Sequence, residues 1–291
     1  MSETLGIATE VEEQPTRGLV AALLGSNVTV GAAICVVMLV AIAVFAPVIA
    51  PYDPLTQSVL NANLQPSADH WLGTDQFGRD VLSRVIFGSR SSLLLGVLSP
   101  LVAAVAGSIL GVTAGYFGGI VDRLVGRLID LLLAFPALLL GILVAAALGP
   151  GFWELVAALA VSFAPRFARI ARASTLSVRN EPFVEAAVAS GVRNQVIIVR
   201  HILPNIAGPI VVVLTLWIAT AIRLEATLSF LGLGTQAPQP SWGNIIRDGL
   251  NNLFGSAWPI VSAGLAIAIT VLAFNLLGDA VRDVLDPELR E

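Results

Sequence analysis

Residues 181–205 carry the side chains whose types and spacing best suit recognition of another protein at a membrane surface. Ala and Glu favour helix, and Gly191 permits a sharp bend. Pro204 is expected to interrupt the helix and to push Leu203 out of the α region. The spacing predicts a helix-bend-helix, and the alternative is an ordinary connecting loop in which Glu185 only caps a helix. The candidate interface residues are Glu185, Ala186, Ala187, Gly191, Leu203, Pro204 and Asn205.

Two charged residues lie inside a predicted membrane span, where a charge costs about 2.5–3.5 kcal/mol on insertion scales. Arg223 and Glu225 are two positions apart and therefore point in different directions on a helix. Both are candidates for the translocation path or its outer gate at a subunit interface. For Glu225 a structural ion pair is an equal alternative. Asp130, at the head of an earlier span, is expected to terminate a helix or to make an interhelical hydrogen bond.

Acidic residues near one histidine could suggest a metal site. His70, Asp75 and Asp80 show no recurring ligand spacing, so we expect them to cap turns or to pair with Arg79 or Arg84. No metal site is predicted. The second histidine falls on the other side of the membrane in the predicted topology, which argues against a membrane-embedded enzyme with a nucleophile and base.

All 16 basic residues are arginine, and the absence of lysine decides which polypeptide can use ATP. A phosphate-binding loop needs Gly-Lys-Ser/Thr to reach the terminal phosphates, and this sequence cannot supply one. If ATP drives the protein, a separate subunit hydrolyses it, and the chain itself is expected to be neither an enzyme nor a cofactor-binding protein. The single cysteine, Cys35, lies in an apolar run and is interpreted as a small hydrophobic residue.

Composition defines the broad class. Of 291 residues, 56% are hydrophobic and 12% are charged, whereas a soluble domain carries about 25% charged residues. The mean hydropathy is +0.85. The net charge of -4 is small, and no basic tail suggests nucleic acid. The chain is therefore expected to be an all-α integral membrane protein.

Hydropathy predicts six transmembrane helices, each near the ~20 residues needed to cross the hydrocarbon core. They lie at about 28–50, 91–116, 127–148, 152–174, 206–230 and 258–280. Residues 81–90 are expected to form a short amphipathic helix that lies on the membrane. Three regions follow: a disordered tail over 1–27, a first span with its outer loop and amphipathic helix over 28–90, and a core of five helices over 91–291.

The spacing of arginines in one predicted span and of glycines in another predicts contacts with the membrane interface and between helices. Arg166, Arg169 and Arg172 lie on one side of the fourth predicted span, so their stems can snorkel to the interface. Three glycines at four-residue intervals, beginning at Gly107, allow close helix approach in the second span. The glycine pattern indicates packing rather than chemistry.

Arginine distribution predicts the orientation. With the N-terminus inside, eleven of the 16 arginines fall in inner segments and one lies within a span. The outer segments hold only Arg79, Arg84, Arg90 and Arg247. The positive-inside rule therefore places both termini and the 181–205 segment in the cytoplasm.

Six stretches, in order along the chain, carry a family resemblance. They are FAPVIAPYDP, LGTDQFGRDVLSRVIFGSRSSLLLG, GYFGGIVDRLVGRLIDLLLAFPALLLGI, EAAVASGVRNQVIIVRHILPN, LEATLSFLGLGTQAPQPSWGNII and FNLLGDAVRDVLDPELR. From about residue 30 to its end, the sequence resembles the C-type permease subunit of the dipeptide/oligopeptide/nickel ATP-binding-cassette importer family. A lone Glu-Ala-Ala would be a weak signal, whereas six ordered blocks are specific.

The resemblance implies a type I importer permease fold in a bacterial plasma (inner) membrane, with 181–205 as the coupling loop. It also implies a B-type permease partner, two ATP-binding subunits or one fused ATPase, which bind ATP and Mg, and an extracytoplasmic binding protein. The implied substrate is a short peptide, with nickel, glutathione or haem as alternatives. A secondary transporter driven by ions is the competing class, but it should carry midplane carboxylates in repeat-related helices.

Overall fold

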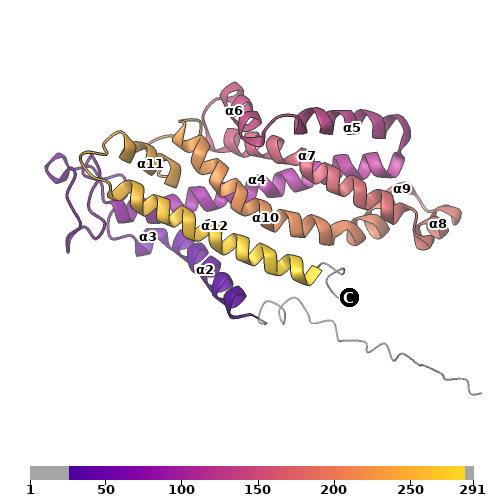
Figure 1. Cartoon of the computed structure of the whole chain (residues 1–291), viewed down its shortest axis with the longest axis horizontal. Coiled ribbons are helices and arrows are strands. Elements are labelled where there is room, and N and C mark those ends of the chain that lie inside the picture. The colour runs from indigo at the N-terminus through magenta and orange to yellow at the C-terminus, as the bar shows by residue number, and fades with distance from the viewer. Residues whose placement is uncertain (1–25, 286–291) are drawn as a thin grey trace, which may run out of the picture.

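A computed structural model describes residues 26–285, and its regular elements are helical apart from one isolated β-bridge between Thr74 and Asp80. The helices are α2 (Asn27–Val44), α3 (Ala46–Ile49), η1 (Val59–Asn61), α4 (Val81–Phe117), α5 (Gly119–Leu133), α6 (Ala137–Leu148), α7 (Phe152–Arg179), α8 (Pro182–Ala189), α9 (Asn194–Ile197), η2 (Ile198–Ile202), α10 (Leu203–Phe230), α11 (Trp242–Leu250) and α12 (Trp258–Leu285). They form an elongated bundle with α11 at one end and α8 and α9 at the other (Figure 1). Apart from its last two positions, the predicted tail 1–27 lies outside the described residues.

Within residues 26–285, four helices are long and apolar enough to cross a membrane. They are α2, α4, α12 and the continuous helix Asn194–Phe230, and the bent pair α5–α6 would make a fifth. Helix α7 begins at the residue predicted for the fourth span but carries four arginines. An all-helical membrane protein is therefore confirmed, while the count of six spans stays a prediction.

The predicted short helix over 81–90 is wrong as a separate element. These residues are the first turns of α4, which runs unbroken from Val81, with the Asp80 carboxylate accepting a hydrogen bond from the Ser83 amide at 2.8 Å. Val81, Arg84 and Ile86 are buried. The apolar spacing that suggested a helix lying on the membrane instead reflects packing inside the bundle.

The span predicted over 127–148 is divided by a sharp bend, and whether it crosses the membrane as one span stays a prediction. Helices α5 and α6 meet at an angle of 95°. Pro136 adopts an extended ψ of 134° at the start of α6. Proline lacks an amide hydrogen, and its ring clashes with the carbonyl four residues earlier, so α5 ends before it.

Pro204 does not stop the helix, contrary to the sequence prediction. Leu203 is helical, with φ -53° and ψ -45°, and its amide bonds to the Ile198 carbonyl five residues back. The π-helical turn η2 precedes it. An i→i+5 turn is wider than an α turn, so it accommodates the proline ring without the usual break, and α9, η2 and α10 form one continuous helix.

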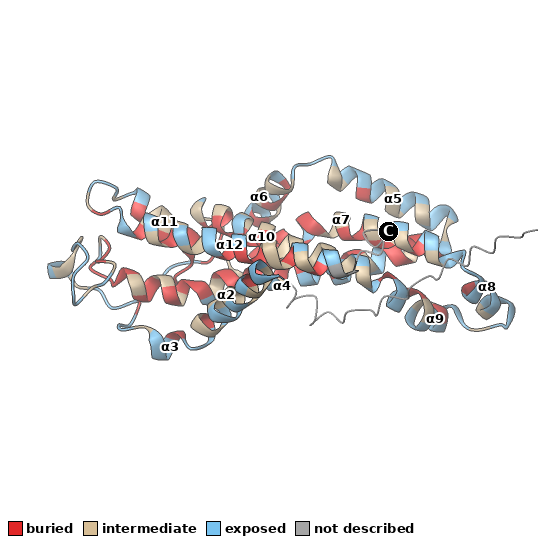
Figure 2. Ribbon diagram, turned by 60° about the horizontal axis from the view of Figure 1, so that its bottom comes forward, coloured by how far each residue is buried: buried red, intermediate tan, exposed pale blue. Residues whose placement is uncertain are grey.

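The tightest helix contact joins α4 to α7. A Cβ atom added to Gly107 would lie 2.5 Å from the Ala164 carbonyl oxygen, and one added to Gly115 would lie 2.9 Å from the Arg172 carbonyl oxygen. Gly111 meets the Ala168 carbonyl in the same way. The predicted small-residue packing is confirmed, and Figure 2 shows the buried residues gathered along this central pair.

We expect Gly111→Ala to destabilise the protein by about 1–3 kcal/mol, the usual cost of overpacking. Its Cβ would enter the space of the α7 backbone, which cannot move aside as a flexible side chain can. The measurement is the midpoint of thermal unfolding of the purified protein in mild detergent. Gly31→Ala is the matched control, because nothing lies within 4 Å of its added Cβ; equal midpoints would contradict the packing argument.

Candidate functional site

The predicted interface helix exists as α8, at the end of the bundle farthest from α11 (Figure 1). Glu185 and Ala186 are exposed, and Ala187 is half-buried. Gly191 has φ +73°, a left-handed conformation that few side chains tolerate, and the Val192 amide closes the turn on the Ala187 carbonyl at 3.1 Å. The predicted bend at Gly191 is confirmed.

Apolar anchors hold this segment against the bundle. Val184, Ile197 and Ile202 are buried in one core cluster with Val112 and Tyr116 of α4. The Tyr116 hydroxyl also bonds to the side-chain oxygen of Asn194 at 2.9 Å. These anchors were not predicted from the sequence, although apolar residues within a polar segment could have indicated buried positions. The result is an element anchored on one side, with Glu185 and Ala186 exposed on the other.

The second group of candidate residues begins α10. Leu203, Pro204 and Asn205 are exposed, and the Asn205 side-chain amide donates to the His201 carbonyl at 2.6 Å. The His201 ring lies 6.3 Å from the Phe183 ring of α8. The structure thus brings the two ends of the 181–205 segment together at one end of the bundle.

Glu225 lies near the opposite end of α10 and is fully buried, with 0% exposure. Its Oε1 accepts a hydrogen bond from the Ser229 hydroxyl at 2.7 Å. The hydroxyls of Ser92 and Ser241, on α4 and at the start of α11, lie beside the same carboxyl group. Its Oε2 atom has no hydrogen-bond partner. Three helices therefore meet around one carboxyl group.

The ion pair offered as one interpretation of Glu225 is not found in the described part of the chain, and its role in a translocation path or outer gate stays a prediction. Among the described residues no arginine is paired with it, and Arg223 points away, exposed, with its guanidinium donating to the Thr220 hydroxyl at 3.3 Å. A group without exposed surface in the single subunit cannot touch a partner subunit or a passing substrate in this conformation. The prediction that Arg223 and Glu225 point in different directions is confirmed.

The α11 end is closed by a buried cluster of ion pairs. Asp75 Oδ2 accepts from Arg79 Nε at 2.7 Å and from Arg84 Nη1 at 2.5 Å. Both arginines also donate to Asp248 of α11, at 3.2 and 3.1 Å. The predicted pairing of Asp75 with arginine is confirmed, whereas Asp248 was missed because it lies far away in sequence.

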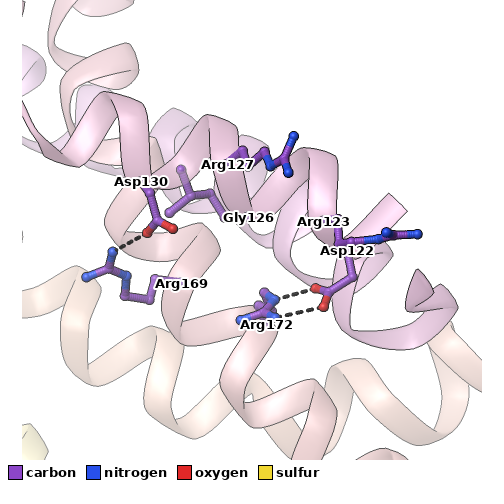
Figure 3. A pocket seen from close by; sticks show the side chains of 8 residues that line it. Asp122, Arg123, Gly126, Arg127, Asp130, Arg169 and Arg172 are labelled. Carbon is purple, nitrogen blue, oxygen red and sulfur yellow. Dashed lines mark hydrogen bonds and ion pairs between the residues drawn. The ribbon is translucent and has the colours of Figure 1, made fainter. Parts of the chain in front are cut away.

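Three arginines of α7 each contact a residue of another helix. Arg172 binds Asp122 of α5 through two hydrogen bonds, one of 2.7 Å, and Arg169 binds Asp130 at 2.8 Å (Figure 3). The Arg166 guanidinium lies 4.7 Å from the centre of the Trp217 ring. The interhelical hydrogen bond predicted for Asp130 is confirmed.

These features define an all-helical membrane permease, and comparison with known proteins gives its family. Residues 107–291 match the family described as binding-protein-dependent transport system inner membrane component, and residues 21–66 match the N-terminal transmembrane domain of oligopeptide transport permease C. The chain belongs to this family of transporter permeases. The resemblance inferred from the sequence blocks is thereby confirmed.

Two curated relatives extend the match over most of the chain. The dipeptide transport system permease protein DppC of Alkalihalophilus pseudofirmus is 40% identical over 257 residues, which is 88% of this chain and 84% of the relative. The glutathione transport system permease protein GsiD of Escherichia coli O1:K1 / APEC is 43% identical over 260 residues, or 89% and 86% of the two chains. The relatives are permease subunits, which are non-catalytic components.

A solved structure has the same fold. An inward-facing conformation of the MetNI methionine ABC transporter has a chain that aligns with a TM-score of 0.56 and 20% sequence identity. The alignment covers 70% of this chain and 97% of that chain. At this identity the likeness shows the fold alone, and it agrees with a type I importer permease.

We expect Asp75→Asn to destabilise the α11 end strongly. Removing one partner of a buried ion pair costs about 3–5 kcal/mol, because the remaining charges stay desolvated. The measurement is the thermal unfolding midpoint in detergent. Asp69→Asn is the control, since Asp69 is exposed in the same loop; a similar midpoint for both variants would show that the cluster contributes little.

We expect Glu225→Gln to fold and transport, and Glu225→Leu to be destabilised by about 1–3 kcal/mol. The amide of Gln still accepts the Ser229 hydrogen bond, whereas Leu leaves the surrounding hydroxyls without that partner. Uptake and unfolding midpoint are measured for both variants. Loss of uptake in a stable Glu225→Gln protein would show that the carboxylate itself takes part in transport.

Proposed function

We propose that this chain is the C-type permease subunit of an ATP-binding-cassette importer for short peptides. The named substrates of the two relatives support this class, because a dipeptide and glutathione are both short peptides. A B-type permease would complete the path, and an extracytoplasmic binding protein would deliver the substrate. ATP and Mg would be bound by separate ATPase subunits, since the chain has no lysine for a phosphate-binding loop.

The exposure of Glu185 and Ala186 on the firmly anchored helix α8 is the observation that carries the coupling role. Its residues Glu185, Ala186 and Ala187, with Gly191 at the bend, would enter a cleft on the ATPase. Leu203, Pro204 and Asn205 would fix the return into α10. Anchoring by buried residues supports this role, because a docking helix must be rigid to pass domain closure into the spans.

Six spans with both termini in the cytoplasm complete the proposed topology. Helix α7 would be the remaining span, since it packs along α4 through the glycine contacts and is shielded from lipid on that side. Its arginines would then face a water-filled path or polar partners, as charges at membrane depth do. The protein would lie in the bacterial inner membrane with α8 inside and α11 outside.

Glu225 is proposed to support the outer gate from within the subunit. Its carboxyl group lies beside Ser241 at the start of α11 and Ser92 of α4. The exposed Arg223 is the residue of this pair that could face the translocation path. In this arrangement Glu225 positions the gate helices and does not contact the substrate.

The first test is affinity purification of the complex in mild detergent, followed by uptake in proteoliposomes. Recovery of a second permease and one or two ATPases, with ATP-dependent uptake of a labelled dipeptide, would establish the proposal. A chain that purifies alone and moves substrate along an ion gradient would replace it with a secondary transporter.

We expect Glu185→Arg to reduce ATP-dependent uptake by about tenfold or more, which corresponds to roughly 1.4 kcal/mol of lost coupling. The reversed charge would face the ATPase, and the spans would stay folded because the side chain is exposed. Uptake, ATPase recovery and the unfolding midpoint are measured together.

Asp69→Arg is the matched control for this prediction. It makes the same change of charge at an exposed residue of the loop at the α11 end, far from the proposed ATPase surface. Full uptake with normal ATPase recovery in Glu185→Arg would contradict the coupling role.

A further inference from the structure

Helix α5 is joined to the bundle by a sharp turn at each end. Gly118 precedes it and Gly119 is its first residue, with φ +65° and +57°, conformations that glycine adopts without steric cost. Its other end is the 95° bend before Pro136. The helix is interrupted at both ends, so a change in the angle of α5 would not require a helix to unwind.

Helix α5 also has little apolar attachment. Ile129 is its one buried residue, and Ile120, Leu124 and Leu131 are exposed on its outer side. Elements with few buried apolar contacts have low local stability. Helices α4 and α7, in contrast, are held together by close contact of their backbones at the glycines.

Charges bind α5 to α7 instead. Asp122 and Asp130, two helical turns apart, pair with Arg172 and Arg169 across a cleft (Figure 3). The Arg169–Asp130 pair is exposed on both sides, and such pairs exchange with water at little cost. The Arg169–Asp130 contact can therefore break and re-form during a transport cycle, whereas the Arg172–Asp122 pair is half-buried.

The space between the two pairs is open. A cleft of about 260 Å³ lies there, lined by Arg123, Arg127, Arg169, Arg172, Asp122 and Asp130. Gly126 lies between the pairs, and nothing is within 4 Å of its added Cβ. The cleft leaves room for α5 to approach α7, and its charges are compatible with a water-filled path.

The turn at Gly118 lies beside Arg179, the last residue of α7, which comes shortly before the 181–205 segment. Arg179 donates to the Gly115 carbonyl at 3.4 Å, and its Nη1 would lie 3.4 Å from a Cβ added to Gly118. Tyr116, on the last turn of α4, bonds to Asn194 at the start of α9. The 181–205 segment is thus linked through Tyr116 to the last turn of α4, just before α5 begins.

We propose that α5 is the moving arm of an inner gate, and that Asp122 and Asp130 are positioning residues that hold it on α7. Movement of the coupling segment would turn the arm at Gly118 and Gly119 through Tyr116. This inference rests on the proposed coupling role of residues 181–205. The alternative is that α5 moves together with α7 and that its aspartates only neutralise arginines.

The test is a reversible tether between α5 and α7 in the complete importer. Asp130→Cys and Arg169→Cys are combined in a Cys35→Ala background, which removes the one native cysteine. A bifunctional methanethiosulfonate reagent then joins the two thiols. We expect ATP-dependent peptide uptake to fall by about tenfold or more and to return when a reductant releases the tether.

Single-cysteine variants show whether the tether itself is responsible. Asp130→Cys and Arg169→Cys, treated separately with the same reagent, should show no further fall in uptake relative to their own untreated samples. Unchanged uptake in the tethered double variant would overturn the proposal, because the arm would then not need to move. Absence of uptake in the Cys35→Ala complex would instead count against the proposed peptide substrate.

A distance measurement tests the arm without any substrate. Spin labels are placed at Arg127→Cys on α5 and Leu176→Cys on α7, both exposed positions, in the Cys35→Ala complex. We expect their distance to change between the nucleotide-free and ATP-vanadate states. A control pair at Val105→Cys on α4 and Val161→Cys on α7, also exposed, should keep its distance. An unchanged α5–α7 distance would overturn the proposal.

Discussion

The close approach of the α4 and α7 backbones is the contact on which the rest of the bundle depends. Three glycines, beginning at Gly107, leave no room for any side chain between the two helices. Packing of this kind replaces the hydrophobic effect, which gives little attraction between helices in lipid. Helix α10 then joins the pair through an apolar core that includes Phe163 and Leu228, so α4, α7 and α10 form one tightly packed unit.

The ion pairs at the α11 end and those between α5 and α7 differ in how far they are buried. At the α11 end, Asp75 and two arginines are almost fully buried and bind one another and Asp248. Between α5 and α7, the Asp130 pair is exposed. A buried cluster is costly to break, because each separated charge remains desolvated, whereas an exposed pair is not. The structure therefore combines a firmly closed α11 end with a loosely held α5.

The 181–205 segment lies where it can act on that loosely held helix. Its anchors pack against the ends of α4 and α7, and Tyr116 ties it to the turn that starts α5. In the proposed importer, ATPase closure would move a docking helix that is already rigid. The π turn before Pro204 extends the same rigidity into α10, because it keeps the helix continuous across a residue that would otherwise end it.

The sequence by itself determined the membrane class, the lack of an ATP-binding loop, the family, the glycine packing and the bend at Gly191. These depend on composition and short-range spacing, which do not change when the chain folds. Only the tertiary structure decided the continuity of α4 through residues 81–90, the bend before Pro136 and the burial of Glu225. The tertiary structure also determined that Asp248 pairs with Arg79 and Arg84 and that Asp122 pairs with Arg172. Each of these features depends on which distant segment packs against the residue. The spacing of neighbouring residues in the sequence does not predict that contact.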